Sequence, residues 1–298
     1  MSWINKIRGF YYYLRGYSLL RKDSFEKAIK TLSKAKDLSP NSAAVYSALG
    51  YCYFNKKEYK IALEVVNQAL ELNSEDDFSK YLKSLVLTEY GKLEEALEIS
   101  KYLTRIAPKT EHYSILHGQI LTELEKYSEA LLVFKTLVNT GKDKITPKIY
   151  IAEIYSKQDK TNESIQTHLE ILKDNPKNEM VLNNLGFTYF KIKEFEKAIP
   201  YFEKAIKLNK NFAFPFNNRG FAHLKLGNLN QAIKDINHSL TLDETNSFAY
   251  KNKALYFLEK NDEKQALELL RKAQTLGFKR SYGTEVNELI EMIEKNSD

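Results

Sequence analysis

Residues 179–210 read EMVLNNLGFTYFKIKEFEKAIPYFEKAIKLNK, and this stretch decides the fold. Its first half places Leu182, Leu185 and Tyr189 at intervals of three and four, which is the spacing of one face of an α-helix. Residues 199–206 repeat that spacing after a short break. Small residues stand among the apolar ones, so two backbones could approach closely. The stretch therefore predicts a pair of packed helices.

A helical pair of this length cannot bury its apolar side chains alone, so it must stack on copies of itself. Such copies follow one another at a step of 34 residues without an insertion. The eighth position of every copy is Gly, Ala or Ser, and the twentieth is Ala or Ser, as close helix packing requires. The eight copies begin at Gly9, Ala43, Asp77, Glu111, Ile145, Glu179, Ala213 and Ser247.

This spacing resembles the tetratricopeptide repeat (TPR) family over residues 9–280, nearly the whole chain. The resemblance implies an all-α fold, a right-handed superhelical solenoid of eight helix-turn-helix repeats. We assign residues 1–280 to the array and residues 281–298 to a C-terminal capping helix. The apolar residues expected to cover the last repeat are Val286, Leu289, Ile290 and Ile293.

Charge and cysteine content bear on the compartment and the partner. Residues 1–36 contain nine Lys or Arg but only two acidic residues, whereas the last helix is rich in Glu. The single cysteine, Cys52, excludes an internal disulfide and fits a reducing compartment. The sequence shows no signal region at its start and no continuous apolar span. We therefore expect a cytoplasmic protein.

Catalytic and metal-binding patterns are missing from the sequence. None of the five histidines belongs to an H-E-x-x-H pattern or lies beside a cysteine at zinc spacing. No glycine-rich phosphate loop and no G-x-S-x-G nucleophile motif occur. We expect no catalytic residue, no metal and no cofactor, so the protein is not expected to be an enzyme.

In the family that the chain resembles, the first helix of each repeat lines the concave side, and the resemblance places partner binding there. The sixth positions of the last three repeats are all asparagine, and two fifth positions add further asparagines. A carboxamide carries both a donor and an acceptor, so this ladder could hold the backbone of an extended peptide. Alternatively, the asparagines only bond to the adjacent helix. The expected groove residues are Asn183, Asn184, Phe187, Asn217, Asn218, Phe221 and Asn252.

The first three repeats carry a second candidate surface, which is largely aromatic. Exposed aromatic residues gathered on one wall often mark an interaction site. The alternative is that the extended N-terminus covers this wall or that it packs between helices. Its residues are Tyr13, Tyr17, Tyr51, Phe54 and Tyr81.

These features together predict a protein–protein interaction scaffold that holds an extended or helical partner segment in its concave groove. A subclass of the family binds acidic C-terminal tails through a clamp of Lys and Arg, but Asn183, Phe187 and Asn252 replace clamp residues, so we do not predict that ligand. The alternative is nucleic-acid binding or anionic-membrane attachment through the basic, aromatic first repeat. We expect neither as the main partner; against nucleic acid, the positive charge is confined to one end, whereas tracking of phosphates requires a continuous basic path. The partner's identity and self-association are left open.

Overall fold

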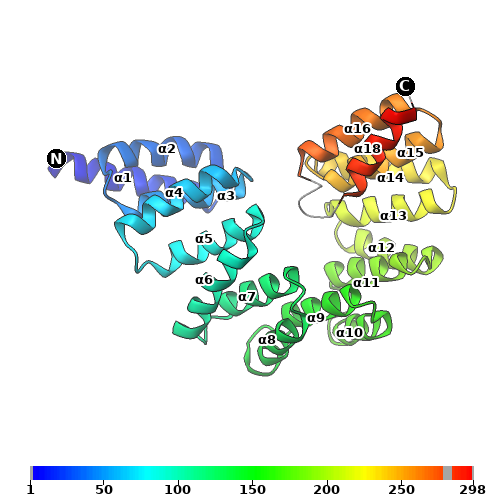
Figure 1. Cartoon of the computed structure of the whole chain (residues 1–298), viewed down its shortest axis with the longest axis horizontal. Helices are drawn as coiled ribbons and strands as arrows, with labels where there is room; N and C mark the ends of the chain where they lie inside the picture. Colours follow the sequence, from blue (N-terminus) through cyan, green and yellow to red (C-terminus); the bar gives the residue numbers. More distant parts are fainter. Residues whose placement is uncertain (1–2, 278–283, 297–298) are drawn as a thin grey trace. The chain divides into compact units, whose positions relative to one another are not determined.

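The computed structural model describes residues 3–277 and 284–296, and every regular element in these ranges is an α-helix. The helices follow one another as antiparallel pairs (Figure 1). The chain divides into two compact units, residues 1–147 and 148–298. The predicted all-α solenoid of helix-turn-helix repeats is confirmed.

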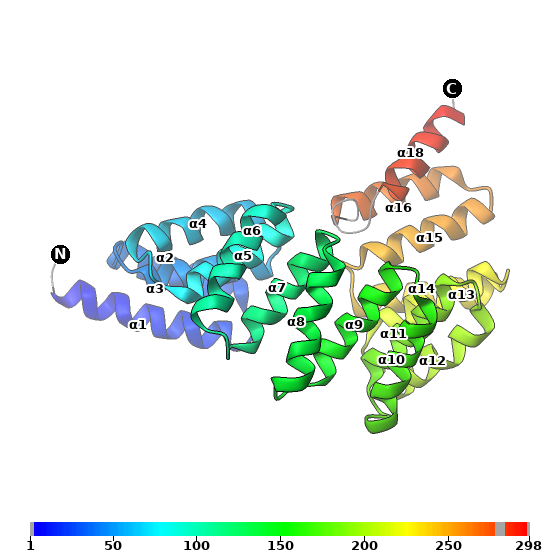
Figure 2. The same ribbon diagram turned by 60° about the horizontal axis from the view of Figure 1, so that its bottom comes forward.

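The first unit contains four helical pairs, in which each first helix packs on the second helix of its own pair and on that of the preceding pair. The stacking order follows the sequence (Figure 2). The helices are α1 (Trp3–Leu20), α2 (Phe25–Leu38), α3 (Ala43–Asn55), α4 (Tyr59–Leu72), α5 (Asp77–Tyr90), α6 (Leu93–Ile106), α7 (Glu111–Glu123) and α8 (Tyr127–Thr140).

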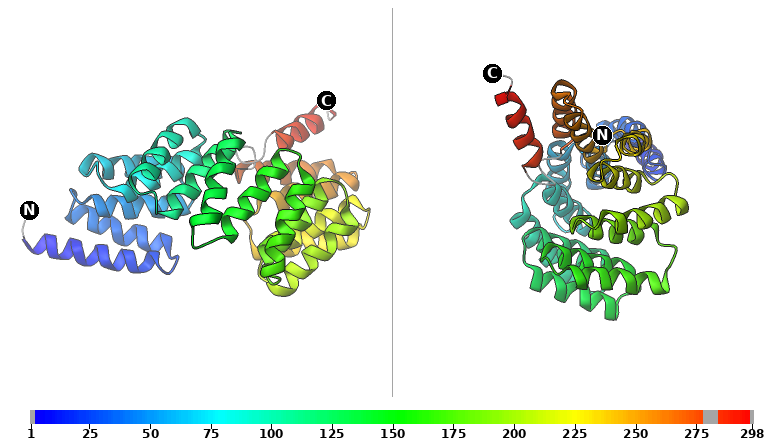
Figure 3. Two further views of the ribbon diagram at one scale, coloured as in Figure 1. Left: turned by 90° about the horizontal axis from the view of Figure 1, so that it is seen from below. Right: turned by 90° about the vertical axis from the view of Figure 1, so that its right-hand side faces the viewer.

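The second unit continues the same pattern and ends with one further helix that packs on α16 (Figure 3). Its helices, of which the first starts just before the boundary between the units, are α9 (Ile145–Lys157), α10 (Thr161–Asp174), α11 (Glu179–Lys191), α12 (Phe195–Leu208), α13 (Ala213–Lys225), α14 (Leu229–Leu242), α15 (Ser247–Glu259), α16 (Glu263–Thr275) and α18 (Glu285–Asn296).

Small residues at the eighth position let the two helices of a pair approach closely. A Cβ atom added to Gly118 would lie 2.6 Å from the ring of Phe134 on the partner helix, and one added to Gly16 would lie 2.6 Å from Leu32. Alanines at the twentieth position, such as Ala130, are fully buried. The large side chain at the twenty-fourth position therefore fills the space that the small residues leave.

A left-handed residue closes the turn between the helices of each pair, at a step of 34 residues. Only two of these eight positions hold glycine, Gly91 and Gly227; the other six are Asp23, Lys57, Glu125, Asp159, Lys193 and Asn261. A residue with a side chain is strained in this conformation. The recurrence shows that the repeat geometry, rather than local preference, sets the backbone at this position.

Helix α18 covers the apolar side of the last pair. Val286, Ile290 and Ile293 are buried against Leu270 and its neighbours on α16, and Leu289 is half-buried beside them. Residues 281–283 and 297–298 of the predicted capping segment lie outside the described residues. In the described part of the chain, no helix has the length and hydropathy to cross a membrane.

Candidate functional site

A pocket of about 660 Å³ lies on the second unit and is lined by residues of α9, α10, α11, α13 and α15 and by the start of α18. All seven expected groove residues of this unit line it. The structure therefore brings them together, although partner binding there stays a prediction. Five phenylalanines form most of its apolar wall: Phe187, Phe190, Phe214, Phe221 and Phe248.

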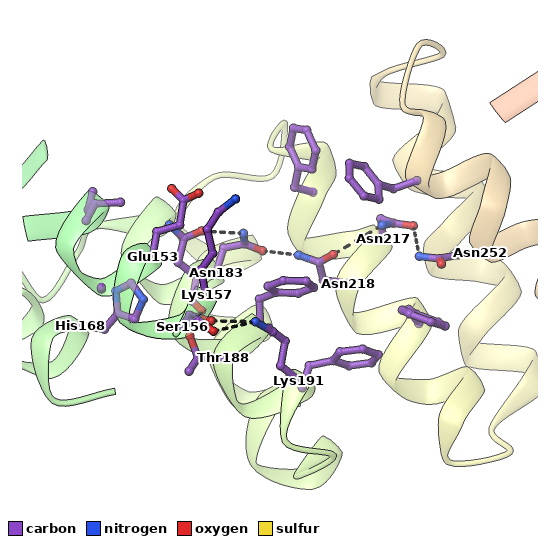
Figure 4. A pocket seen from close by; sticks show the side chains of 18 of the residues that line it. Glu153, Ser156, Lys157, His168, Asn183, Thr188, Lys191, Asn217, Asn218 and Asn252 are labelled. Atoms are coloured by element: carbon purple, nitrogen blue, oxygen red, sulfur yellow. Dashed lines mark hydrogen bonds between the residues drawn. The ribbon is translucent and has the colours of Figure 1, made fainter. Parts of the chain in front are cut away.

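A chain of hydrogen-bonded carboxamides runs along the pocket and joins three helices (Figure 4). Asn252 Nδ2 of α15 donates to Asn217 Oδ1 of α13 at 3.0 Å, and Asn218 Nδ2 of α13 donates to Asn183 Oδ1 of α11 at 2.9 Å. Within each helix, the fifth-position amide donates to the sixth-position oxygen: Asn217 to Asn218 at 3.5 Å, and Asn183 to Asn184 at 3.3 Å. The direction of donation is the same in all four bonds, from Asn252 through Asn217, Asn218 and Asn183 to Asn184.

The carboxamide chain differs from the predicted ladder. The ladder was expected to run along the sixth positions, with two fifth positions beside it, but each bond between repeats joins a fifth position to the sixth position of the next repeat, 35 residues later. Asn183, Asn217 and Asn252 are buried, whereas Asn184 and Asn218 are partly exposed. The asparagines therefore bond to the adjacent helix, as the alternative held, and also line the pocket.

One end of this series of carboxamides has an acceptor that no described residue satisfies. Asn252 is 2 % exposed, and its Oδ1 atom has no hydrogen-bond partner. A buried carbonyl without a donor destabilises the protein by roughly 1–3 kcal/mol. Because Asn252 lines the pocket, a donor from a bound molecule could satisfy this buried oxygen once a shift of the side chain uncovers it.

His168 lies at the other end of the pocket (Figure 4). The side chain is 3 % exposed, and its Nδ1 atom has no hydrogen-bond partner in the part of the chain that the structure describes. Burial lowers the pKa of His168 to about 4, so the ring is neutral at physiological pH. His168 was not among the residues expected at the groove. The signal was present, however, because the corresponding position of most other repeats holds a large apolar residue.

Two lysines at the pocket have partners within the chain. The Nζ atom of Lys251 lies 3.1 Å from Glu285 Oε2, at the start of α18, and 5.0 Å from the ring centre of Phe221. Lys191 Nζ donates to the carbonyl and hydroxyl oxygens of Ser156 on α9. Neither contact was expected from the sequence, because both depend on segments about 35 residues apart.

The aromatic residues predicted in the first repeats lie on α1, α3 and α5 of the first unit, and none of them lines the pocket. Tyr17 is exposed, whereas Tyr13, Tyr51, Phe54 and Tyr81 are partly buried. The rings of Tyr13 and Tyr17 are 6.2 Å apart. Burial raises the pKa of Tyr13 and Tyr81, so both hydroxyls stay protonated at neutral pH. A binding role for this surface stays a prediction.

Across residues 3–277 and 284–296, no group of three or more His, Cys, Asp or Glu side chains is placed to hold a metal ion.

Comparison with protein families gives three matches. Residues 180–212 and 201–234 each match a model described as tetratricopeptide repeat. Residues 22–103 match the model for subunit 3 of the anaphase-promoting complex, or cyclosome. Among curated proteins, the SGT1 homolog of Bos taurus is 29% identical over 86 residues, which are 28% of this chain and 25% of that protein. The chain thus spans about a quarter of this relative's length.

Solved structures with low sequence identity share the fold. Yeast Tom70 gives a TM-score of 0.71 at 17% identity, with 92% of this chain and 60% of that chain covered. A tetratricopeptide repeat protein of Parabacteroides merdae gives 0.59 at 16% identity, covering 96% and 99%. The Cut9–Hcn1 hetero-tetramer of the APC/C gives 0.57 at 16% identity, covering 90% and 52%. Together these findings lead to one conclusion: the chain contains tetratricopeptide repeats, matched over residues 180–234, within a solenoid of stacked helical pairs.

Proposed function

We propose that the pocket of the second unit binds an extended segment of a partner protein. The tetratricopeptide fold implies a protein–protein interaction scaffold. The observation that supports binding at this pocket is that Asn252 Oδ1 is a buried acceptor without a partner among the described residues. This atom lies at the end of the series of hydrogen-bonded carboxamides. Five phenylalanines line the same pocket, so it combines an apolar wall with a small number of placed polar groups.

An extended segment fits this acceptor better than a helix does. The backbone N–H groups of a helix are bonded internally beyond its first turn, whereas those of an extended chain are free to donate. A peptide N–H would satisfy Asn252 whatever side chain its residue carries. The partner's side chains would then contact the rings of Phe214 and Phe248.

The charges at the pocket favour an uncharged, apolar segment. Lys251 is paired with Glu285, and Lys191 is bonded to Ser156. These ammonium groups already have partners within the chain, so an acidic ligand would have to compete with them. The apolar wall, in contrast, is open at Phe187 and Phe214, whose side chains are exposed.

One structural neighbour is a complex: Cut9 was crystallised with Hcn1 as a hetero-tetramer. Its likeness to this chain concerns the fold alone, but it supports a binding protein over an enzyme. We also place the protein in the cytoplasm, because its only cysteine, Cys52, is a free buried thiol that suits a reducing compartment. No cofactor is part of the proposed function.

The test begins with a library of random peptides displayed on phage and selected against the intact protein. Selected peptides should bind the Phe187→Ser/Phe214→Ser variant at least roughly tenfold more weakly, which corresponds to losing about 1.4 kcal/mol of apolar contact. Both side chains are exposed, so the variant should keep its fold. The matched control is Met180→Ser, an exposed apolar residue of α11 outside the pocket, which should bind as the wild type does.

The backbone contact has its own test. Each amide of a selected peptide is N-methylated in turn, which removes one donor at a time. Affinity should fall sharply at one position, and that loss should vanish in the Asn252→Ala variant, since the acceptor is then gone. Peptides that bind the double phenylalanine variant and the wild type equally well would refute the pocket as the binding site. A Tyr17→Ser variant shows whether the aromatic surface of the first unit binds them instead.

A further inference from the structure

The second surface of interest is the exposed side of α1, which packs on α2 and touches α3 with its opposite side and which includes Tyr17 of the predicted aromatic surface. Gly9, Gly16 and Leu20 are buried on the packed side. The exposed side carries seven large apolar residues, more than any other described helix of the chain. These are Trp3, Ile4, Ile7, Phe10, Tyr11, Leu14 and Tyr17.

Five of these residues form a continuous stripe: Trp3, Ile7, Phe10, Leu14 and Tyr17. Their steps of four, three, four and three residues are the spacing of a heptad seam, along which one helix packs against another. The rings of Phe10 and Tyr13, and of Tyr13 and Tyr17, are in contact, so the stripe has a rigid aromatic side.

The first turns of α1 extend past the end of α2 (Figure 2). A Cβ atom added to Gly9 would meet Ser39, which follows the last residue of α2. Residues before Gly9 therefore have little of α2 beside them, and Trp3 is 75 % exposed. The stripe runs from this free end to Tyr17, a length of about 20 Å at 1.5 Å per residue.

Basic residues border the full exposed apolar face, the stripe together with Ile4 and Tyr11, on both sides. With 3.6 residues per turn, Lys6 falls just beyond one edge of the apolar arc, and Arg8 and Arg15 fall just beyond the other. All three are exposed. A second copy of α1 would bring like charges together, so the charge pattern disfavours self-association through this face and favours an occupant with acidic flanks.

We propose that the stripe of α1 docks an amphipathic helix of a partner protein, with apolar residues at heptad spacing and Asp or Glu beside them. The seam spacing specifies a helix, and the basic borders specify its charge. This surface is separate from the pocket of the second unit, so either proposal can fail without the other.

The test uses the protein's single tryptophan as its probe. Trp3 lies at the free end of the stripe, so a docked helix should shift its fluorescence to shorter wavelength. Two tryptophan-free synthetic helical peptides are compared, both with Leu at heptad positions a and d; one carries Glu and the other Lys at e and g. The Glu peptide should bind at least roughly tenfold more tightly than the Lys peptide.

Three variants define the site. Ile7→Ser/Leu14→Ser should abolish the fluorescence shift, whereas Leu132→Ser, an exposed leucine of α8, should leave it unchanged. Arg8→Glu/Arg15→Glu should reverse the preference, so that the Lys peptide binds more tightly. The Phe187→Ser/Phe214→Ser variant should respond as the wild type does, which separates this surface from the pocket.

Three results would overturn the proposal. The Glu and Lys peptides could bind with equal affinity, which would show that the basic residues beside the stripe do not select an acidic helix. Trp3 fluorescence could shift with protein concentration alone, which would identify a second copy as the occupant. Vesicles of phosphatidylserine and phosphatidylcholine could shift it when neither peptide does, which would identify a lipid surface.

Discussion

Asn218 of α13 donates a hydrogen bond from Nδ2 to Asn183 Oδ1 of α11 at 2.9 Å, across 35 residues of sequence. The same pairing, one repeat later, joins Asn252 to Asn217 at 3.0 Å. These carboxamides connect the first helices of successive pairs directly, whereas most packing in the stack runs through the second helices. The side chains that line the pocket thus also hold its walls together.

Asn218→Ala should lower the free energy of unfolding by about 1–3 kcal/mol, because it leaves Asn183 Oδ1 without its donor and removes the acceptor of Asn217. Asn218→Asp should destabilise further, since a carboxylate would face the carbonyl oxygen of Asn183. Urea denaturation measures both. Asn162→Ala, an exposed asparagine of α10, is the control and should change stability little. An Asp variant as stable as the wild type would show that Asn218 does not donate this bond.

The turn residues between helices offer a paired prediction. Gly227→Ala should destabilise by about 1 kcal/mol, because φ is +75° there and no atom lies within 4 Å of the added Cβ, so only backbone strain acts. Lys193→Gly, at the equivalent turn with φ of +64°, should stabilise by a smaller amount, since glycine also gains freedom in the unfolded chain. Thermal denaturation of both variants checks the signs. Equal effects in the same direction would contradict strain at this position.

His168 should make stability fall in mild acid. The pKa of His168 is about 4 in the folded protein and 6.5 in the unfolded chain. As the pH falls below 6.5, the unfolded chain therefore binds a proton at this residue that the folded protein does not bind, and the unfolded state is stabilised. The loss should reach about 3 kcal/mol near pH 4. His168→Leu should remove this part of the pH dependence, and the difference between the two proteins isolates it from His117 and His223, whose pKa is also lowered by burial.

The His168→Leu variant reproduces a pair of residues, alanine against leucine, that another repeat of the protein already contains. Ala254 packs with Leu270 in the last pair, at the positions that Ala152 and His168 hold in theirs. Urea denaturation at pH 7 and pH 5 provides the measurement. Parallel losses of stability in the wild type and the variant would mean that His168 titrates normally.

Cys52 should resist thiol reagents in the native protein. Burial raises the pKa of its thiol to about 12, and the side chain is fully buried, so both thiolate and access are lacking at pH 8. Ellman's reagent should react slowly with the folded protein and rapidly after guanidinium denaturation. Because there is no other cysteine, the signal belongs to this residue. Rapid reaction without denaturant would show that the first two helical pairs open readily.

Much of the fold could be predicted from spacing. The small residues at the eighth and twentieth positions marked where helices approach, and Gly118 and Ala130 pack as expected against the partner helix. The turns were harder to predict, because Lys57, Glu125 and Lys193 carry no preference for the left-handed conformation that the stack imposes on them. The sequence also marked the asparagines, but it did not give their bonding or the position of His168 and Glu285 at the same pocket.

The sequence by itself determined the helical pairs and their order, because a helix and its apolar face follow from spacing within about ten residues. Only the tertiary structure decided which carboxamide oxygen stays without a donor, since that depends on helices 35 residues apart meeting in one register. It also decided that the apolar stripe of α1 faces outward rather than packing. Periodicity reveals that a face is apolar, whereas burial depends on whether another element is there to cover it.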